Sequence, residues 1–188
     1  MSKSKKTLLF LLGVSLIPIL ASYLLYFRGT HLSRMNHGEL LTTRPAGLDT
    51  LFGDNPLQRQ TFADLLKKKW VYLTVQPPAC DTRCQRKLYL MRQVRTAQNE
   101  NMLRVERVWV IVGEGQPDPR LLAEHSGLHL TRVTDVSQLP QLPLGSDPGA
   151  YIFLIDPLGN LVLRYDDHSE PKGMLKDLGR LLRYSGLG

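Results

Sequence analysis

The apolar residues of this chain begin with one unbroken run and continue as several shorter periodic patterns. Residues 7–27 carry no charged side chain and are rich in Leu, Ile and Tyr. About 20 apolar residues are enough to cross a bilayer as a helix. The run therefore predicts a single transmembrane helix at 7–27, in contact with membrane lipid, and Pro18 is tolerable inside it.

A cleavable signal peptide is the alternative for this segment. Such peptides have an apolar region of about 7–15 residues that ends in small residues. The run here is longer, and Ala21, the best cleavage point, has the bulky Ile19 two positions before it. We therefore expect an uncleaved anchor.

Positive charges predict the orientation of this anchor, because cytoplasmic flanks are enriched in Lys and Arg. Three lysines precede the span and two arginines follow it: Lys3, Lys5, Lys6, Arg28 and Arg34. Residues 1–6 are therefore predicted to be a cytoplasmic tail at the inner membrane. The part of the chain after the span is predicted to be periplasmic.

Two regions are expected after the anchor. In residues 28–55, glycine and proline interrupt every apolar run, which favours a tether followed by a surface segment. Residues 56–188 contain the strand-like and helix-like patterns and are predicted to form one folded domain.

Short apolar runs rich in β-branched and aromatic residues predict the strands of this domain. They lie at 70–75, 105–112 and 128–133, and an antiparallel hairpin is predicted from Tyr151–Ile155, a turn at 156–160, and Leu161–Leu163. Four stretches with helical spacing or caps predict helices: one capped by Thr61, one after Cys84, one begun by Asp118 and Pro119, and one capped by Ser169.

The alternation of strands and helices predicts the fold class. Strands alternating with helices require a mostly parallel sheet packed against helices, and the hairpin adds antiparallel strands. We therefore predict an α/β, thioredoxin-like sandwich with a central mixed sheet, preceded by the transmembrane helix. Another small α/β sandwich is the alternative.

Composition narrows the classes of function. The net charge is +7, from 24 Lys and Arg against 17 Asp and Glu, but three of the bases precede the anchor. The exported part is therefore only mildly basic, and no nucleic-acid partner is expected. Two cysteines exclude a scaffold of several disulfides and a zinc site of four thiolates.

The candidate chemistry lies at Cys80 and Cys84, where the strand at 70–75 gives way to a helix. Helical positions four apart have Cβ atoms about 5–6 Å apart, so the two sulfurs can close a disulfide or share one soft metal ion. The helix N-terminus and Arg83 favour a thiolate, while Asp81 opposes it. Cys80 is expected to be the more acidic and more exposed. The alternative is that both cysteines are inert core residues.

These features together resemble the Sco/SenC family. The anchor, the strand at 70–75, the sequence CDTRC with Leu88 and Met91 after it, and the hairpin YIFLIDPLGN carry the resemblance over about residues 61–184. MRQVR at 91–95, RVERVWVI at 104–111 and PKGMLKDLGRLL at 171–182 are more similar to small transmembrane proteins associated with bacterial cytochrome oxidase assembly.

The resemblance implies a membrane-anchored thioredoxin-fold assembly factor for the copper centre of cytochrome c oxidase. It implies that Cys80 and Cys84 are the copper-binding and redox-active pair. The histidine ligand of the family lies eleven residues before the hairpin glycine, and that position is Pro148 here. This departure disfavours Cu(II) and leaves Cu(I) transfer or thiol-disulfide exchange. A cis peptide bond before Pro148 is open but not indicated.

Other residues are assigned ordinary roles. His168 is expected to be a surface residue near a helix cap, and His125, His129, His31 and His37 are expected not to bind a metal. Five basic residues without an intervening acid are expected to form a solvated helix face, with attraction to acidic lipid or to an acidic partner as the alternative: Arg83, Arg86, Lys87, Arg92 and Arg95.

The sequence thus predicts an assembly factor that presents Cys80 and Cys84 to a cytochrome c oxidase subunit or another assembly factor. It either exchanges disulfides with this partner or passes on Cu(I). Two alternatives remain: a noncatalytic docking protein with the same fold, and a general periplasmic thiol-disulfide reductase.

Overall fold

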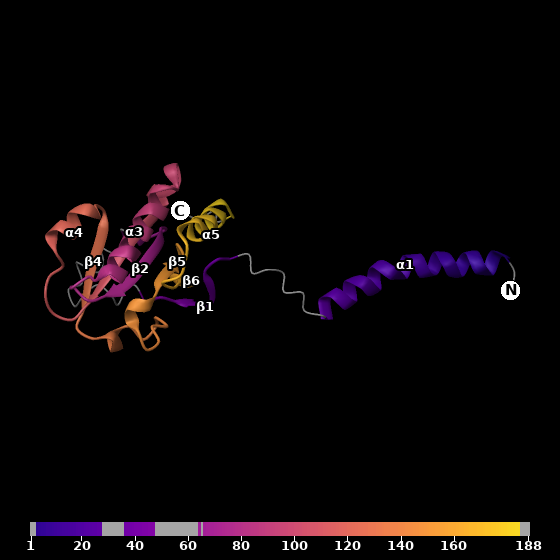
Figure 1. Cartoon of the computed structure of the whole chain (residues 1–188), viewed down its shortest axis with the longest axis horizontal. Coiled ribbons are helices and arrows are strands. Elements are labelled where there is room, and N and C mark those ends of the chain that lie inside the picture. The colour runs from indigo at the N-terminus through magenta and orange to yellow at the C-terminus, as the bar shows by residue number, and fades with distance from the viewer. Residues whose placement is uncertain (1–2, 28–35, 48–63, 65, 185–188) are drawn as a thin grey trace. The chain divides into compact units, whose positions relative to one another are not determined.

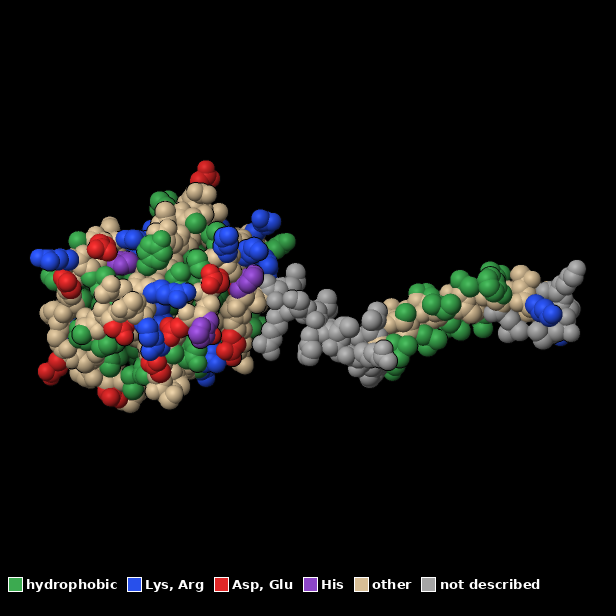
Figure 2. Space-filling view, in the orientation of Figure 1, with side chains coloured by type: hydrophobic (Ala, Val, Ile, Leu, Met, Phe, Trp, Pro, Cys, Tyr) green, Lys and Arg blue, Asp and Glu red, His purple; other side chains and the backbone are tan. Residues whose placement is uncertain are grey.

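The computed structural model describes residues 3–27, 36–47, 64 and 66–184. The chain divides into two compact units, Met1–Met35 and Asn36–Gly188 (Figure 1). The first unit contains α1, Lys3–Phe27, a helix long and apolar enough to cross a membrane. The helix predicted at 7–27 is therefore present, and the large apolar side chains described on it, between Phe10 and Leu24, are exposed (Figure 2).

The second unit is built on a mixed sheet of six strands in the order β1-β6-β5-β2-β3-β4. The neighbours β2, β3 and β4 are parallel, and β1, β5 and β6 are joined by antiparallel pairs. The strands are β1 Glu39–Pro45, β2 Trp70–Gln76, β3 Val105–Val112, β4 Leu128–Val133, β5 Ile152–Ile155 and β6 Asn160–Tyr165. The thioredoxin-like mixed sheet and all of the predicted strands are confirmed.

Strand β1 was not among the predicted elements. It pairs with β6 at the edge of the sheet, and most of its residues are exposed. A buried carboxylate holds the chain just before it, because Asp177 accepts hydrogen bonds from the backbone N–H groups of His37 and Gly38. Contacts with distant residues specify this strand, so its own sequence carries no clear strand pattern.

Alternate residues of the central strands divide the core between the two faces of the sheet. Val71, Leu73 and Val75 face a cluster that includes Leu139, Leu142 and Leu144 from the segment before β5. Trp70 and Tyr72 face the other side, which is covered by helices. These are α3 Thr82–Thr96, with buried Met91 and Val94, and α5 Pro171–Tyr184, with buried Met174, Leu178 and Leu182.

The helix ends follow the predicted signals in part. Asp118 caps the short α4, Pro119–Glu124, by accepting from the N–H of Arg120. Ser169 does not cap α5, contrary to the prediction, because its hydroxyl bonds with Asp166. The predicted cap at Thr61 lies outside the described residues. The described residues of the unit also form three 3₁₀ helices: η2 Asn99–Arg104, η3 Val136–Gln138 and η4 Pro148–Ala150.

The chain direction gives the sheet two distinct ends. The carboxyl end of β2 leads into α3, and the segment between β6 and α5 lies beside it. We call this the disulfide end. The opposite end contains the first residues of β2 and β3, the turn between β5 and β6, and the last turn of α5.

Candidate functional site

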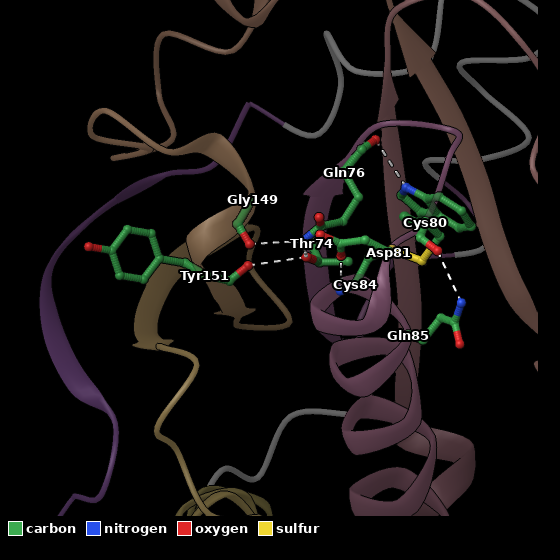
Figure 3. Close-up of a disulfide and its surroundings, with 9 residues drawn as sticks. Thr74, Gln76, Cys80, Asp81, Cys84, Gln85, Gly149 and Tyr151 are labelled. Atoms are coloured by element: carbon green, nitrogen blue, oxygen red, sulfur yellow. Dashed lines mark hydrogen bonds between the residues drawn. A yellow bond between two sulfur atoms is a disulfide. The ribbon is translucent and has the colours of Figure 1, made fainter.

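The site is a disulfide between Cys80 and Cys84 at the disulfide end, with Cα atoms 5.2 Å apart (Figure 3). Cys84 is fully buried and packs with Leu88, Trp109 and Ile111. Cys80 is half-buried and lies against the edge of this cluster. The structure therefore brings the two predicted residues together, with Cys80 the more accessible.

The turn that carries the disulfide is fixed by local hydrogen bonds (Figure 3). Asp81 is the N-cap of α3, and its carboxylate accepts from the N–H of Cys84 at 2.8 Å. The side chain of Gln85 donates to the carbonyl of Cys80 at 3.1 Å. The Asp81 carboxylate binds a free amide at the N-terminus of α3. Its negative charge therefore offsets part of the stabilisation that this helix N-terminus gives to a thiolate.

An ion-pair network connects this turn to two separate segments. Arg83, between the two cysteines, pairs with Asp147 before η4 and with Asp167 before α5. Lys87, one turn further along α3, also pairs with Asp167. We call these four residues the acid–base network. It joins three segments that meet at the disulfide end.

The network shifts the pKa of two of its members. The hydrogen bonds that Arg83 donates to Asp167 and Asp147 raise the pKa of Arg83, which remains a cation. Partial burial would raise the pKa of Asp167, but the hydrogen bonds from Lys87 and Arg83 outweigh it and hold the pKa below its ordinary value. Asp167 is therefore an anion at neutral pH.

The five basic residues of α3 form the predicted solvated face only in part: Arg83 and Arg86 are exposed, whereas Lys87 is buried. Lys87 is only 2% exposed, and Arg83 is held by carboxylates. Arg92 donates to the carbonyl of Glu124, and Arg95 donates to that of Val105 at 2.6 Å. Within the described residues, Arg86 alone of the five has no hydrogen bond or ion pair. Lys87 lies three residues after Cys84 and four before Met91, so the helical period itself places it on the buried face.

A pocket of about 320 Å³ adjoins the disulfide-bearing turn. Its wall combines apolar and charged side chains from four segments: Val75, Gln76, Pro77, Asp81, Arg83, Val112, Val136, Asp147, Pro148 and Gly149. Polar groups and apolar surface therefore converge beside the cysteines, as in most ligand sites.

The floor of the site depends on Gln76, which sequence reasoning did not single out. Its side-chain amide donates to the carbonyl of Gly149 at 2.9 Å and to the hydroxyl of Thr74 (Figure 3). Its own carbonyl accepts from the indole N–H of Trp109 at 3.2 Å. Gln76 thus joins β2 to η4 and to the core beneath Cys84. A polar glutamine at the end of an otherwise apolar strand is the sequence signal that indicates this role.

The described residues contain no group of three or more His, Cys, Asp or Glu arranged to hold a metal ion. Pro148 lines the pocket but offers no ligand atom, and no described peptide bond is cis. The candidate metal ligands at the site are therefore the two sulfur atoms of Cys80 and Cys84. Two soft thiolates suit Cu(I), whereas Cu(II) prefers imidazole nitrogen, which the residues described around the site do not supply.

The described histidines lie in other environments. His129 pairs with Glu106, and His125 is buried, where desolvation and then Arg92 and Arg107 lower its pKa. His168 is exposed before α5, and His37 lies before β1. His31 lies outside the described residues.

Solved structures share this fold. Copper-bound yeast Sco1 is 14% identical, with a TM-score of 0.53 over 63% of this chain and 81% of that chain. Apo Sco1 from Thermus thermophilus is 18% identical, with a TM-score of 0.56 over 78% and 96%. Copper-bound ScoI from Arabidopsis thaliana is 16% identical, with a TM-score of 0.51 over 63% and 86%. These likenesses confirm the thioredoxin-like fold.

Comparison with family sequence profiles identifies the family to which the chain belongs. A search of curated proteins finds no match. The profile of the transmembrane-like, thioredoxin-like C-terminal domain matches residues 70–185, which is more than half of the chain. The chain belongs to this family of transmembrane-like, thioredoxin-like C-terminal domains.

Proposed function

We propose that this chain is a membrane-anchored, periplasmic assembly factor for cytochrome c oxidase that acts by thiol-disulfide exchange through Cys80 and Cys84. The observation that carries the chemistry is the asymmetry of the pair, with Cys80 half-buried and Cys84 fully buried at the start of α3. The oxidase role rests on the resemblance to Sco/SenC proteins, and the inner-membrane location rests on the apolar helix α1.

The reaction consists of two exchanges. In the reduced form, the Cys80 thiolate attacks one sulfur of a partner disulfide and forms a mixed disulfide, and the other partner sulfur leaves as a thiolate. The Cys84 thiolate then attacks Cys80, which restores the Cys80–Cys84 bond and releases the second partner thiolate. The partner gains two electrons and this chain loses them. A dithiol reductant must reduce this chain before the next turnover.

The pocket supports recognition of a polypeptide partner. Its apolar wall includes Val75, Val112 and Pro148, and its charged wall includes Asp81 and Arg83. Residues next to a partner cysteine would lie in this pocket while the partner sulfur reaches Cys80. Gln76 and the acid–base network hold η4 beside the disulfide, so the wall is formed before the partner arrives.

Delivery of Cu(I) is the second candidate, with the metal as cargo. After reduction, the two sulfurs four residues apart can bind one soft ion, and copper-bound Sco structures share the fold. Anaerobic Cu(I) titration of the reduced full chain tests this. Tight binding of one ion, lost in the Cys80→Ser variant, supports delivery, and its absence leaves thiol-disulfide exchange.

A trapping experiment tests the exchange. Cys84→Ser leaves Cys80 free to attack but removes the resolving thiol, so a mixed disulfide with an oxidase subunit or assembly factor should accumulate. Cys80→Ser should trap far less because Cys84 is buried. Ala79→Ser is the matched control and should behave as the wild type.

The alternatives predict different results. A docking protein would support oxidase maturation when both cysteines are replaced by serine, and this outcome would overturn the exchange chemistry. A general reductase would reduce unrelated disulfides such as those of insulin as fast as oxidase substrates. The proposed assembly factor requires both cysteines and prefers its oxidase partner.

A further inference from the structure

The end of the domain opposite the disulfide is formed by elements far apart in the sequence. β2 and β3 begin there with Trp70 and Val105 paired side by side. β5 runs antiparallel to β2, so the turn at 156–160 lies at the same end. The last turn of α5 joins it, because Arg104 donates to the carbonyl of Leu182 at 3.1 Å.

This end carries most of the exposed large apolar side chains that are described on the folded unit. Leu103 is 63% exposed, Leu158 is 71% exposed and Tyr184 is 79% exposed, and Met102 lies beside Leu103. The others are Leu40, Tyr89 and Leu130. Apolar side chains that gather at one end of a soluble domain indicate an interaction surface.

Basic residues surround these apolar side chains. They are Arg44, Lys67, Lys68, Lys69, Arg104 and Arg183. Figure 2 shows Lys and Arg side chains gathered over α5, with hydrophobic side chains beside them. The acids described at this end include Asp64, Glu100, Glu106 and Asp156. Glu106 pairs with His129, and Asp156 accepts from the N–H groups of Leu158 and Asn160 within the hairpin turn. We call this surface the basic end.

The two ends of the domain differ in charge. Among the acids at the disulfide end are Asp81, Asp147, Asp166, Asp167 and Glu170. Its cations include Arg83 and Lys87, which are held by carboxylates, and the exposed Arg86 and Lys172. An anionic surface would therefore attract the basic end and not the disulfide end. The attraction would weaken with salt, because the basic side chains are at the surface.

We propose that the basic end docks on the anionic headgroup surface of the membrane in which α1 is anchored. Exposed leucine, methionine and tyrosine among lysine and arginine suit the boundary between headgroups and acyl chains. The described part of α1 ends at residue 27 and the described part of the folded unit begins at residue 36, and the eight residues between them can span no more than about 29 Å. The membrane is thus always within reach. This inference rests on the membrane anchoring stated under Proposed function.

Docking gives the domain a defined orientation. With the basic end on the headgroups, the carboxyl end of β2 and the start of α3 point away from the lipid. Cys80 would then be offered to a partner at some distance above the membrane instead of being covered by it. The anchor alone would leave the domain free to rotate.

Quenching by spin-labelled lipid in nanodiscs tests this orientation. The full chain, at one copy per disc, carries a fluorophore on an added cysteine at Leu158→Cys, or at Leu130→Cys in the middle of β4 as the matched control. The discs contain phosphatidylcholine with or without phosphatidylglycerol, and a fraction of the lipid carries a nitroxide. We expect severalfold stronger quenching at 158 than at 130, only with phosphatidylglycerol, and loss of this difference at high salt.

Reversing the charge of two basic residues provides a second test of docking. Lys67→Glu with Arg183→Glu should abolish the difference, since each basic residue near an anionic surface contributes roughly fivefold to the docked population. Arg86→Glu with Lys172→Glu, two exposed changes outside the basic end, should leave it intact. Equal quenching at 158 and 130 overturns docking, and so does quenching at 158 that persists after reversal. Thiol-exchange assays of the same variants are independent: normal exchange without docking removes only this inference.

Discussion

The ammonium group of Lys87, a residue that is 2% exposed, is paired with the carboxylate of Asp167, which lies 80 positions further along the chain. Asp167 also accepts from Arg83, which lies between the two cysteines. The helix that carries the disulfide is therefore tied to the start of α5 by one shared carboxylate. Several measurements follow from this arrangement and from the packing around it.

Replacing Lys87 by methionine should destabilise the folded chain by about 2 kcal/mol. Removal of one partner of a buried pair leaves the other without compensation, and the cost is reduced here because Asp167 retains Arg83 and is one-third exposed. Urea unfolding of the full chain in detergent measures the change. Arg86→Met, on the exposed side of the same helix, should change stability by less than about 0.5 kcal/mol. Equal effects of the two would contradict the pairing.

The same pair should make stability depend on pH in acid. The pKa of Asp167 is lowered below 3.8 in the folded chain, so its contribution is present above that value and is lost as pH falls through the lower folded value. The difference in unfolding free energy between wild type and Asp167→Asn should therefore be largest near neutral pH and shrink below about pH 3.8. A difference that stays constant down to strongly acid pH would show that the charge of Asp167 is not responsible.

Asp81→Asn should make Cys80 more acidic. Asparagine still caps a helix, so the fold is kept, while the negative charge next to the sulfur disappears. We expect the pKa of the Cys80 thiol in the reduced chain to fall by about one unit, and the disulfide to become easier to reduce. The pH dependence of alkylation gives the pKa, and equilibrium with glutathione gives the potential. An unchanged pKa would mean that the carboxylate is screened from the sulfur.

Asp177→Ala should release the edge strand β1. The carboxylate accepts from the N–H groups of His37 and Gly38 and from the hydroxyl of Tyr165 at 3.3 Å, and its loss leaves these buried donors unpaired. We expect a loss of about 3 kcal/mol and faster hydrogen exchange in 39–45 than in β2 or β3. Lys176→Ala, the exposed neighbour, is the control. Uniform acceleration across all strands would contradict a local role.

Pro148→His should add a nitrogen donor to the pocket beside the disulfide. Pro148 and Asp81 line the same pocket, and imidazole is the donor that Cu(II) requires and the two sulfurs do not supply. The reduced variant should bind Cu(II) with absorption bands for sulfur and nitrogen coordination, and at least tenfold more tightly than the wild type. Pro143→His, on the other side of η4, is the control.

The sequence predicted the elements whose residue pattern lies within one short segment of the chain. Apolar runs located β2 and β3, and the spacing of Cys84, Leu88 and Met91 located the buried face of α3. The strand-to-helix junction placed both cysteines at one site. These features depend on residues within one or two turns of each other, so periodicity alone predicts them.

Features that depend on distant contacts were not predicted. Lys87 lies three residues after Cys84 and four before Met91, on the buried face of α3, and its partner Asp167 comes from the other end of the domain. Strand β1 exists because Glu39 pairs with Arg164 and because Asp177 binds the backbone before it. Such contacts join residues 80 to 140 positions apart, and no pattern within one segment records them.

Asp177 also determines how the domain responds to tension. A pull transmitted from residue 35 acts first on the hydrogen bonds at His37 and Gly38, and then on the pair between Glu39 and Arg164 at the edge of the sheet. These contacts at the edge of the sheet would therefore be loaded before β2 and β3, the parallel strands that support the disulfide.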